Sequence, residues 1–295
     1  MASLHSGPRC LLFDNGSLRP ESTLNLRGIA GRLQTALGVE VQPASLLHSS
    51  AIPPGELEGV PAQLLVPALQ ACLAAGTAGI VLLPLFFGPS AALTDQLPPK
   101  LEALRRKHPG QRVWFGRCLV DPSAKDDFRI ASILAENVRT AMTLESLERP
   151  PVVLVDHGSP QRAVVAVRDF LAGQLAVLLA GEIDQLVAAS MERRPGAEYD
   201  FCDPLLSAVL RRPGLCERQV IVAQQFLSPG RHAGMGGDVE GICREAERDH
   251  PRLKTYPTRL IGADERLIPV LCDRYREALA SAPIIESDRS QGRNE

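Results

Sequence analysis

The chain has 295 residues, of which 45% are hydrophobic and 22% are charged, and its formal net charge is −2. This composition is typical of a soluble globular protein and excludes a general attraction to nucleic acid or to an anionic membrane. Aromatic residues make up only 4% of the chain, which also argues against a surface that stacks nucleic-acid bases.

The sequence shows no targeting segment and no pattern of disulfide bonds. The N-terminus lacks a basic region followed by an apolar stretch, and no apolar run approaches the roughly 18 residues that span a membrane. The cysteines are odd in number and form no CxxC pair; they are Cys10, Cys72, Cys118, Cys202, Cys216, Cys243 and Cys272. We therefore expect reduced thiols, no iron–sulfur cluster and a cytoplasmic location.

The first half of the chain alternates short apolar runs with amphipathic segments. A predicted strand at residues 10–13 ends at Asp14-Asn15-Gly16-Ser17, and a predicted helix follows at 24–37. The next predicted elements are a strand near 44–46, a helix at 64–75, a strand at 80–83, a helix at 100–107, a strand at 113–115 and a helix at 130–147. Strands that alternate with helices are typical of βαβ units on a parallel sheet.

The second half repeats this order. A β-branched apolar run at 152–155 predicts a strand buried on both faces, and it ends at Asp156-His157-Gly158-Ser159. The turn of the first half has the same residues, except that Asn15 stands in the place of His157. The remaining predicted elements are a helix at 164–179, a segment at 188–192, a helix at 205–211, a strand at 220–223, a helix at 239–248, a strand at 253–257 and a helix at 267–280.

Self-similarity of this kind predicts an internal duplication. We expect an α/β fold of two Rossmann-like or flavodoxin-like domains with parallel sheets and a cleft between them. The expected boundaries are residues 1–148 for the first domain, 149–280 for the second and 281–295 for a flexible polar tail.

Three potential ligands fall at the carboxyl ends of strands in the second half, the edge where open α/β sheets bind ligands. His157 follows the first strand, Glu192 the second, and His232 lies in the loop after the third. Two imidazoles and a carboxylate can converge on a divalent transition metal such as iron, cobalt, nickel or zinc. Taken singly, each histidine could be an ordinary loop residue, and Glu192 could belong to a solvated run of charges.

The same segments carry groups that suit an acidic ligand. Ser159 can cap the helix that follows the first turn, and Gly230 allows the backbone of the His232 loop to bend around a bulky molecule. Several arginines lie near the three potential ligands and can bind carboxylates in a bidentate manner; they are Arg162, Arg193, Arg194 and Arg231.

Two motifs of this half, "LVDHGSP" and "FLSPGRHAGMGGD", resemble those of the class II chelatases, the CbiX and SirB proteins that insert cobalt or iron into sirohydrochlorin-type tetrapyrroles. The resemblance covers residues 151–280 well and the first half more faintly, through "FDNGS" and "LPLFFGPS". It implies a lyase of cobalamin or siroheme biosynthesis that binds a tetrapyrrole between two lobes without ATP. The metal would be a substrate, Co²⁺, Fe²⁺ or Ni²⁺, and the protein a monomer or homodimer.

In that family the two histidines of the motifs face the macrocycle and the metal, and they match His157 and His232. The acidic residue after the second strand is matched by Glu192. The resemblance makes these three the catalytic and metal-binding residues, with either histidine as base or ligand, and makes Ser159, Arg162, Gly230 and Arg231 the tetrapyrrole-binding residues. The first half departs from the pattern through Asn15 and Ala92, with Leu47 or His48 at the acidic position, so it is expected to be catalytically empty.

Two other functions remain open. A chelatase-like protein without catalytic activity could carry a tetrapyrrole or a metal in the same cleft. A nucleotide-binding α/β protein is the weaker alternative, because neither a GxGxxG motif nor a P-loop follows the first strand of either half.

Overall fold

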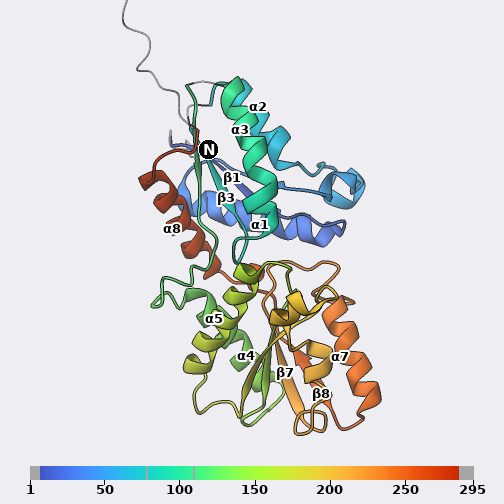
Figure 1. The fold of residues 1–295 in the computed structure, drawn as a ribbon. Helices are drawn as coiled ribbons and strands as arrows, with labels where there is room; N and C mark the ends of the chain where they lie inside the picture. Colours follow the sequence, from blue (N-terminus) through green and yellow to red (C-terminus); the bar gives the residue numbers. More distant parts are fainter. Residues whose placement is uncertain (1–6, 78, 109, 286–295) are drawn as a thin grey trace, which may run out of the picture. The chain divides into compact units, whose positions relative to one another are not determined.

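The computed structural model describes residues 7–77, 79–108 and 110–285 (Figure 1). The chain forms two compact units, which we describe separately. Unit 1 comprises residues 1–119 and 268–295, and unit 2 comprises residues 120–267. None of the helices in the described residues is long and apolar enough to span a membrane.

Unit 1 contains a four-stranded sheet with the order β2-β1-β3-β4, in which all neighbouring strands are parallel. Its elements are β1 (Arg9–Asp14), α1 (Pro20–Leu37), β2 (Val41–Ser45), α2 (Leu65–Ala74), β3 (Gly79–Pro84), α3 (Leu97–Lys107), β4 (Arg112–Phe115) and nearly all of α8 (Leu267–Ala280). The first strand is central, as its continuous apolar run predicts.

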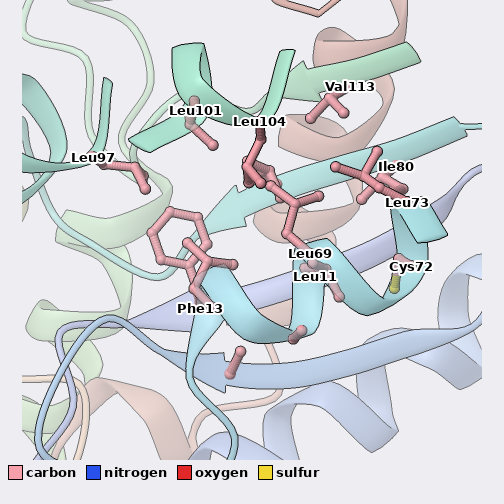
Figure 2. Packing of buried hydrophobic residues seen from close by; sticks show 14 of the residues in the cluster. Leu11, Phe13, Leu69, Cys72, Leu73, Ile80, Leu97, Leu101, Leu104 and Val113 are labelled. Atoms are coloured by element: carbon pink, nitrogen blue, oxygen red, sulfur yellow. The ribbon is translucent and has the colours of Figure 1, made fainter. Parts of the chain in front are cut away.

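Alternate side chains of β1 pack against helices on opposite faces of this sheet. Leu11 and Phe13 lie in a cluster with residues of α2 and α3 (Figure 2). Cys10 faces the other way, where Cys272 of α8 lies close to it. Both Leu11 and Phe13 are fully buried, and burial of a side chain of this size contributes about 1.5–3 kcal/mol.

Unit 2 contains a second four-stranded parallel sheet with the equivalent order β6-β5-β7-β8. Its elements are α4 (Arg129–Leu144), β5 (Val152–Asp156), α5 (Arg162–Leu178), β6 (Leu186–Ser190), α6 (Leu206–Val209), β7 (Gln219–Gln224), α7 (Asp238–Asp249) and β8 (Lys254–Pro257). Helices α6 and α7 pack on one face of the sheet, and α4 and α5 contact each other beside it (Figure 1). The α/β class and the duplicated parallel sheets are therefore confirmed.

The boundaries of the compact units differ from the expected domain boundaries at residues 148 and 280. Helix α4 packs against α5 and β7, so it belongs to unit 2 although it precedes residue 148. Helix α8 belongs almost entirely to unit 1, where Arg274 donates hydrogen bonds of 3.0 Å to the carbonyl oxygens of Cys118 and Leu119. Each half thus contributes its closing helix to the other unit, and the chain passes between the units twice.

The segment expected to be a flexible tail, residues 281–295, begins in contact with unit 1. Ile284 donates a hydrogen bond of 2.8 Å from its backbone N–H to the carbonyl oxygen of Val113 in β4. Ile285 is 2% exposed and packs in the hydrophobic cluster of unit 1, which ties this part of the C-terminus to the sheet. Residues 286–295 lie outside the described residues.

Candidate active site

The turn after β5 brings the segments that follow two neighbouring strands close together. The N–H of Glu192 donates a hydrogen bond of 3.2 Å to the carbonyl oxygen of His157. Gly158, which follows His157, has a φ of +85°, and a Cβ atom at this glycine would lie 2.0 Å from the carbonyl oxygen of Glu192. Only glycine fits this turn without strain, and the close approach places Glu192 beside His157.

The His157 ring contacts a backbone oxygen on one side and a carboxylate on the other. Its Nδ1 lies 2.9 Å from the carbonyl oxygen of Gly158, and its Nε2 lies 3.3 Å from Oε1 of Glu192. A carbonyl oxygen can only accept a hydrogen bond, so the proton of the neutral ring belongs on Nδ1. Nε2 then presents its lone pair toward Glu192, and a proton or a cation that enters this position can be shared by the imidazole and the carboxylate.

His232 lies against His157 at the same edge of the sheet. The ring centroids are 4.4 Å apart, with 65° between the ring planes. Nδ1 of His232 lies 2.7 Å from Oδ2 of Asp238, the first residue of α7. Because the carboxylate accepts, Nδ1 carries the proton and Nε2 of a neutral ring keeps its lone pair, which is the arrangement of histidines that bind metals.

The structure thus brings together His157, His232 and Glu192, which sequence reasoning selected, and adds Asp238, which it missed. The side chains of the first three are 46%, 32% and 59% exposed, so solvent and ligands can reach them. Among the described residues, no group of three or more His, Cys, Asp or Glu side chains is arranged as a metal-holding cluster. The site therefore offers two adjacent imidazoles, which leave most coordination positions of a bound metal open.

The arginines expected to bind carboxylates differ in the contacts that their guanidinium groups make. Arg193 lies 2.9 Å from Asp200 and 3.2 Å from Asp203, so it is committed to internal ion pairs and is a poor candidate for binding a substrate carboxylate. The Arg162 guanidinium stacks 4.4 Å above the Phe201 ring, a contact that leaves its N–H groups available. The side chain of Arg231 is 78% exposed, with its Nε 3.7 Å from Asp238.

Two smaller predictions concerned loop residues. Ser159 does not cap α5: the helix begins at Arg162, its N-cap residue is Gln161, and no side chain caps it. The Ser159 hydroxyl accepts a hydrogen bond of 3.1 Å from the N–H of Gln161 and so shapes the loop before the helix. Gly230 donates a hydrogen bond of 2.9 Å to the carbonyl oxygen of Ala233, which closes a turn around His232.

A buried polar network lies at the ends of β5 and β6, next to the candidate site. Arg168 of α5 is 2% exposed, and its Nη1 donates to Oγ of Ser190 at 2.6 Å and to the carbonyl oxygen of Cys202 at 2.8 Å. Burial raises the pKa of the Asp156 carboxyl, even though the Ser190 hydroxyl and the Arg168 guanidinium lower it. The network fixes the ends of β5 and β6, and with them the separation of His157 and Glu192.

Unit 1 has the same backbone at the equivalent edge but different side chains. Gly16 has a φ of +87°, and a Cβ atom there would lie 1.8 Å from the carbonyl oxygen of Leu47. The N–H of Leu47 donates to the carbonyl oxygen of Asn15 at 3.1 Å, the bond that Glu192 makes to His157 in unit 2. Leu47, and not His48, is therefore the equivalent of Glu192, and this edge carries Asn15 and Leu47 where unit 2 carries His157 and Glu192.

Comparison with known proteins identifies structural relatives only. A scan against models of known protein families and a search of curated proteins find no match. Among solved structures, SirB from Bacillus subtilis with Fe³⁺ is 16% identical and has a TM-score of 0.66, covering 93% of this chain and 96% of its own. The sirohydrochlorin chelatase SirB from Bacillus subtilis subspecies spizizenii in complex with cobalt is 16% identical, with a TM-score of 0.65 and coverage of 94% and 99%.

A third similar structure is CbiX, described as the terminal enzyme for biosynthesis of siroheme in denitrifying bacteria. It is 13% identical, has a TM-score of 0.59, and covers 92% of this chain and 99% of its own. The chain therefore has the fold of two-domain sirohydrochlorin chelatases over nearly its whole length, which supports the resemblance seen in the two sequence motifs.

Proposed function

We propose that this protein is a metallochelatase that inserts a divalent metal into sirohydrochlorin or a related tetrapyrrole without ATP. The observation that carries the proposal is the pair of imidazoles of His157 and His232, 4.4 Å apart at the carboxyl edge of the unit 2 sheet, each with a carboxylate beside it. The chelatase fold supports the same function, and the cobalt- and iron-bound structures of the neighbours suggest Co²⁺ or Fe²⁺ as the metal substrate.

The site suits transient delivery of a metal. Imidazole nitrogen binds cobalt, iron and nickel, and two such ligands leave positions open for water and for the ring nitrogens of the incoming macrocycle. A complete cage of protein ligands would hold the metal and oppose its transfer. The proposed Nε2 atoms of His157 and His232 are therefore enough to bind the ion without trapping it.

Insertion also requires the removal of two pyrrole N–H protons. We propose that the imidazole that is not holding the metal accepts a proton, because histidine titrates near neutral pH. Glu192 lies 3.3 Å from Nε2 of His157 and can receive the proton from it. Asp238 keeps Nε2 of His232 free and stabilises the positive charge when that ring is protonated.

Binding of the acidic macrocycle is proposed for the exposed arginines beside the site. Arg162 is fixed by its stacking on Phe201, and Arg231 lies next to His232 on the loop that closes at Gly230. Planar guanidinium groups bind carboxylates in a bidentate manner, so these two arginines would orient the acidic side chains of the tetrapyrrole.

The proposed location is the cytoplasm. All of the cysteines are free thiols, as expected in a reducing compartment.

The test is an anaerobic assay of the purified protein with sirohydrochlorin and Co²⁺ or Fe²⁺, followed by visible absorption. We expect insertion at least about 100-fold faster than in buffer, the usual contribution of positioned acid–base groups. The His157→Ala/His232→Ala double variant should lose this acceleration, whereas His250→Ala, which removes a histidine at the end of α7, should retain it. A wild-type rate equal to that in buffer would contradict the proposal, and product binding without acceleration would identify a carrier.

A further inference from the structure

The two units differ at one buried position that lies outside the candidate active site. Asp14 and Asp156 end the equivalent strands β1 and β5, and Leu26 and Arg168 occupy the same place in the helices that follow. In unit 2 the guanidinium of Arg168 bonds Ser190 and the loop carbonyl of Cys202 and lies close enough to Asp156 to stabilise its charge. Leucine in unit 1 can do none of this.

A cavity of about 140 Å³ lies in unit 1 beside Leu26, the residue equivalent to Arg168. Three segments border it: α1, the end of β2 and the loop before α2; its lining residues include Thr23, Leu26, Ser45, Ala62 and Gln63. In unit 2, Arg168 donates hydrogen bonds to Ser190 at the end of β6 and to Cys202 in the loop before α6. Ser45 is the equivalent of Ser190, because each serine pairs with the residue before the next helix, Leu64 or Leu205. The cavity therefore marks the place of the missing guanidinium.

Two buried polar atoms of this part of unit 1 lack partners. Oδ1 of Asp14 and Oγ1 of Thr23 are buried and form no hydrogen bond with any described residue. Thr23 is 6% exposed and lines the cavity. Burial raises the pKa of Asp14 to about 6, and the hydroxyl of Ser45, which also lines the cavity, is near enough to lower it. Buried polar atoms in native proteins are normally satisfied, so these atoms are available to a bound ion or water.

We propose that this cavity binds one small monovalent cation, an alkali or ammonium ion, at the place of the Arg168 guanidinium of unit 2. The hydroxyls of Thr23 and Ser45 line the cavity and would be ligands, and the carboxylate of Asp14, which lies beside Ser45, would supply the balancing negative charge. A single carboxylate among neutral oxygens matches a single positive charge, whereas hard divalent cations in proteins usually take several acidic ligands. Arg27 does not fill this role, because its guanidinium donates to the carbonyl oxygens of Leu57 and Val60 at 2.8 and 2.6 Å.

Unfolding of unit 1 provides the test. Trp114 is the only tryptophan of the chain, lies in β4 and is 6% exposed, so its fluorescence reports the unfolding of unit 1. The full-length protein is unfolded by heat in chloride salts of sodium, potassium, ammonium and tetramethylammonium at one ionic strength. We expect at least one of the three small cations to raise the midpoint by about 3–6 °C in a saturable manner relative to tetramethylammonium.

Three variants and a control assign the response to the cavity. Asp14→Asn should abolish it, and Leu26→Arg should also abolish it by placing a guanidinium in the cavity. Thr23→Val, which keeps the shape of the side chain, should weaken the apparent affinity at least about fivefold. Glu56→Gln, which removes an exposed carboxylate of the same unit, should leave the response unchanged.

Equal midpoints in all four salts would overturn the proposal and indicate that water fills the cavity. A response of unchanged size in Asp14→Asn or Leu26→Arg would also overturn it, because the cation would then act elsewhere on the protein. Should Asp14→Asn fail to fold, Thr23→Val decides: an unaltered affinity in that variant contradicts the proposed ligands.

Discussion

The carboxyl edges of the two sheets have the same backbone conformation but carry different side chains. Both turns keep an aspartate, a glycine with positive φ and a hydrogen bond to the segment after the neighbouring strand. Only unit 2 adds groups that can bind a metal or move a proton, at His157, Glu192 and His232. The glycine and the aspartate therefore serve the geometry of the turn, whereas the histidines are not needed for it, since unit 1 forms the same turn without them.

The largest expected effect is on catalysis and separates the two edges. His157→Ala should lower the rate of cobalt insertion by about 1,000-fold, close to 4 kcal/mol, because it removes a group that acts on metal or proton. Asn15→Ala, the matched change in unit 1, should leave the rate within about twofold of wild type. Rates measured with saturating sirohydrochlorin check both values. A comparable loss in the two variants would show that unit 1 takes part in the chemistry.

Substitution of either turn glycine, Gly16 or Gly158, should destabilise its unit to a similar extent. Gly158→Ala and Gly16→Ala each force a Cβ atom to within about 2 Å of a backbone oxygen at positive φ, so each should lower the free energy of unfolding by about 3 kcal/mol or more. Trp114 fluorescence during urea unfolding measures the effect of Gly16→Ala, and circular dichroism follows Gly158→Ala. Gly28→Ala, where a Cβ atom meets nothing within 4 Å, is the control.

The buried aspartate of unit 1, Asp14, lacks the arginine that accompanies Asp156 in unit 2. Burial raises the pKa of Asp14 to about 6 from 3.8, so the folded state binds more protons than the unfolded state between these values. The stability of unit 1 should therefore fall as pH rises from about 4 to 6, by up to about 3 kcal/mol, when only tetramethylammonium salts are present.

Asp14→Asn should flatten this part of the pH profile, as measured by urea unfolding followed through Trp114. The same dependence in Asp14→Asn and in wild type would assign the titration to another group.

The smallest expected effect concerns the carboxylate beside His232. Asp238→Asn keeps the shape of the side chain, but the amide cannot neutralise an imidazolium. We therefore expect the affinity for Co²⁺ or the rate of insertion to fall about tenfold. The pH–rate profile should shift as well, which a purely structural role of Asp238 would not produce. Asp238→Glu should restore part of the activity, and an unchanged pH profile in Asp238→Asn would exclude the proposed role.

Much of the fold follows from local patterns. The buried runs at 10–13 and 152–155 and the amphipathic segments after them predict the strands and helices to within a few residues, because burial sets their periodicity. Likewise, the edge rule for parallel sheets was enough to group His157, Glu192 and His232. These features depend on residues close together in the sequence or on one general property of the fold.

The features that the sequence did not reveal depend on contacts between distant residues. The exchange of α4 and α8 between the units is set by packing, and both helices read as ordinary closing helices of their own half. Arg168 looked like any polar residue of an amphipathic helix, and its burial follows from partners on β6 and its loop. Asp238 could have been suspected as an acidic residue at the start of a helix, soon after His232.

We propose that His157 and His232 together bind the metal that is to be inserted. It is tested most directly by anomalous X-ray diffraction from crystals of the protein soaked in Co²⁺. We expect one strong peak within about 2.0–2.2 Å of Nε2 of both histidines, the distance typical of imidazole bound to a divalent metal. A cobalt ion bound elsewhere, with these two rings left free, would contradict it.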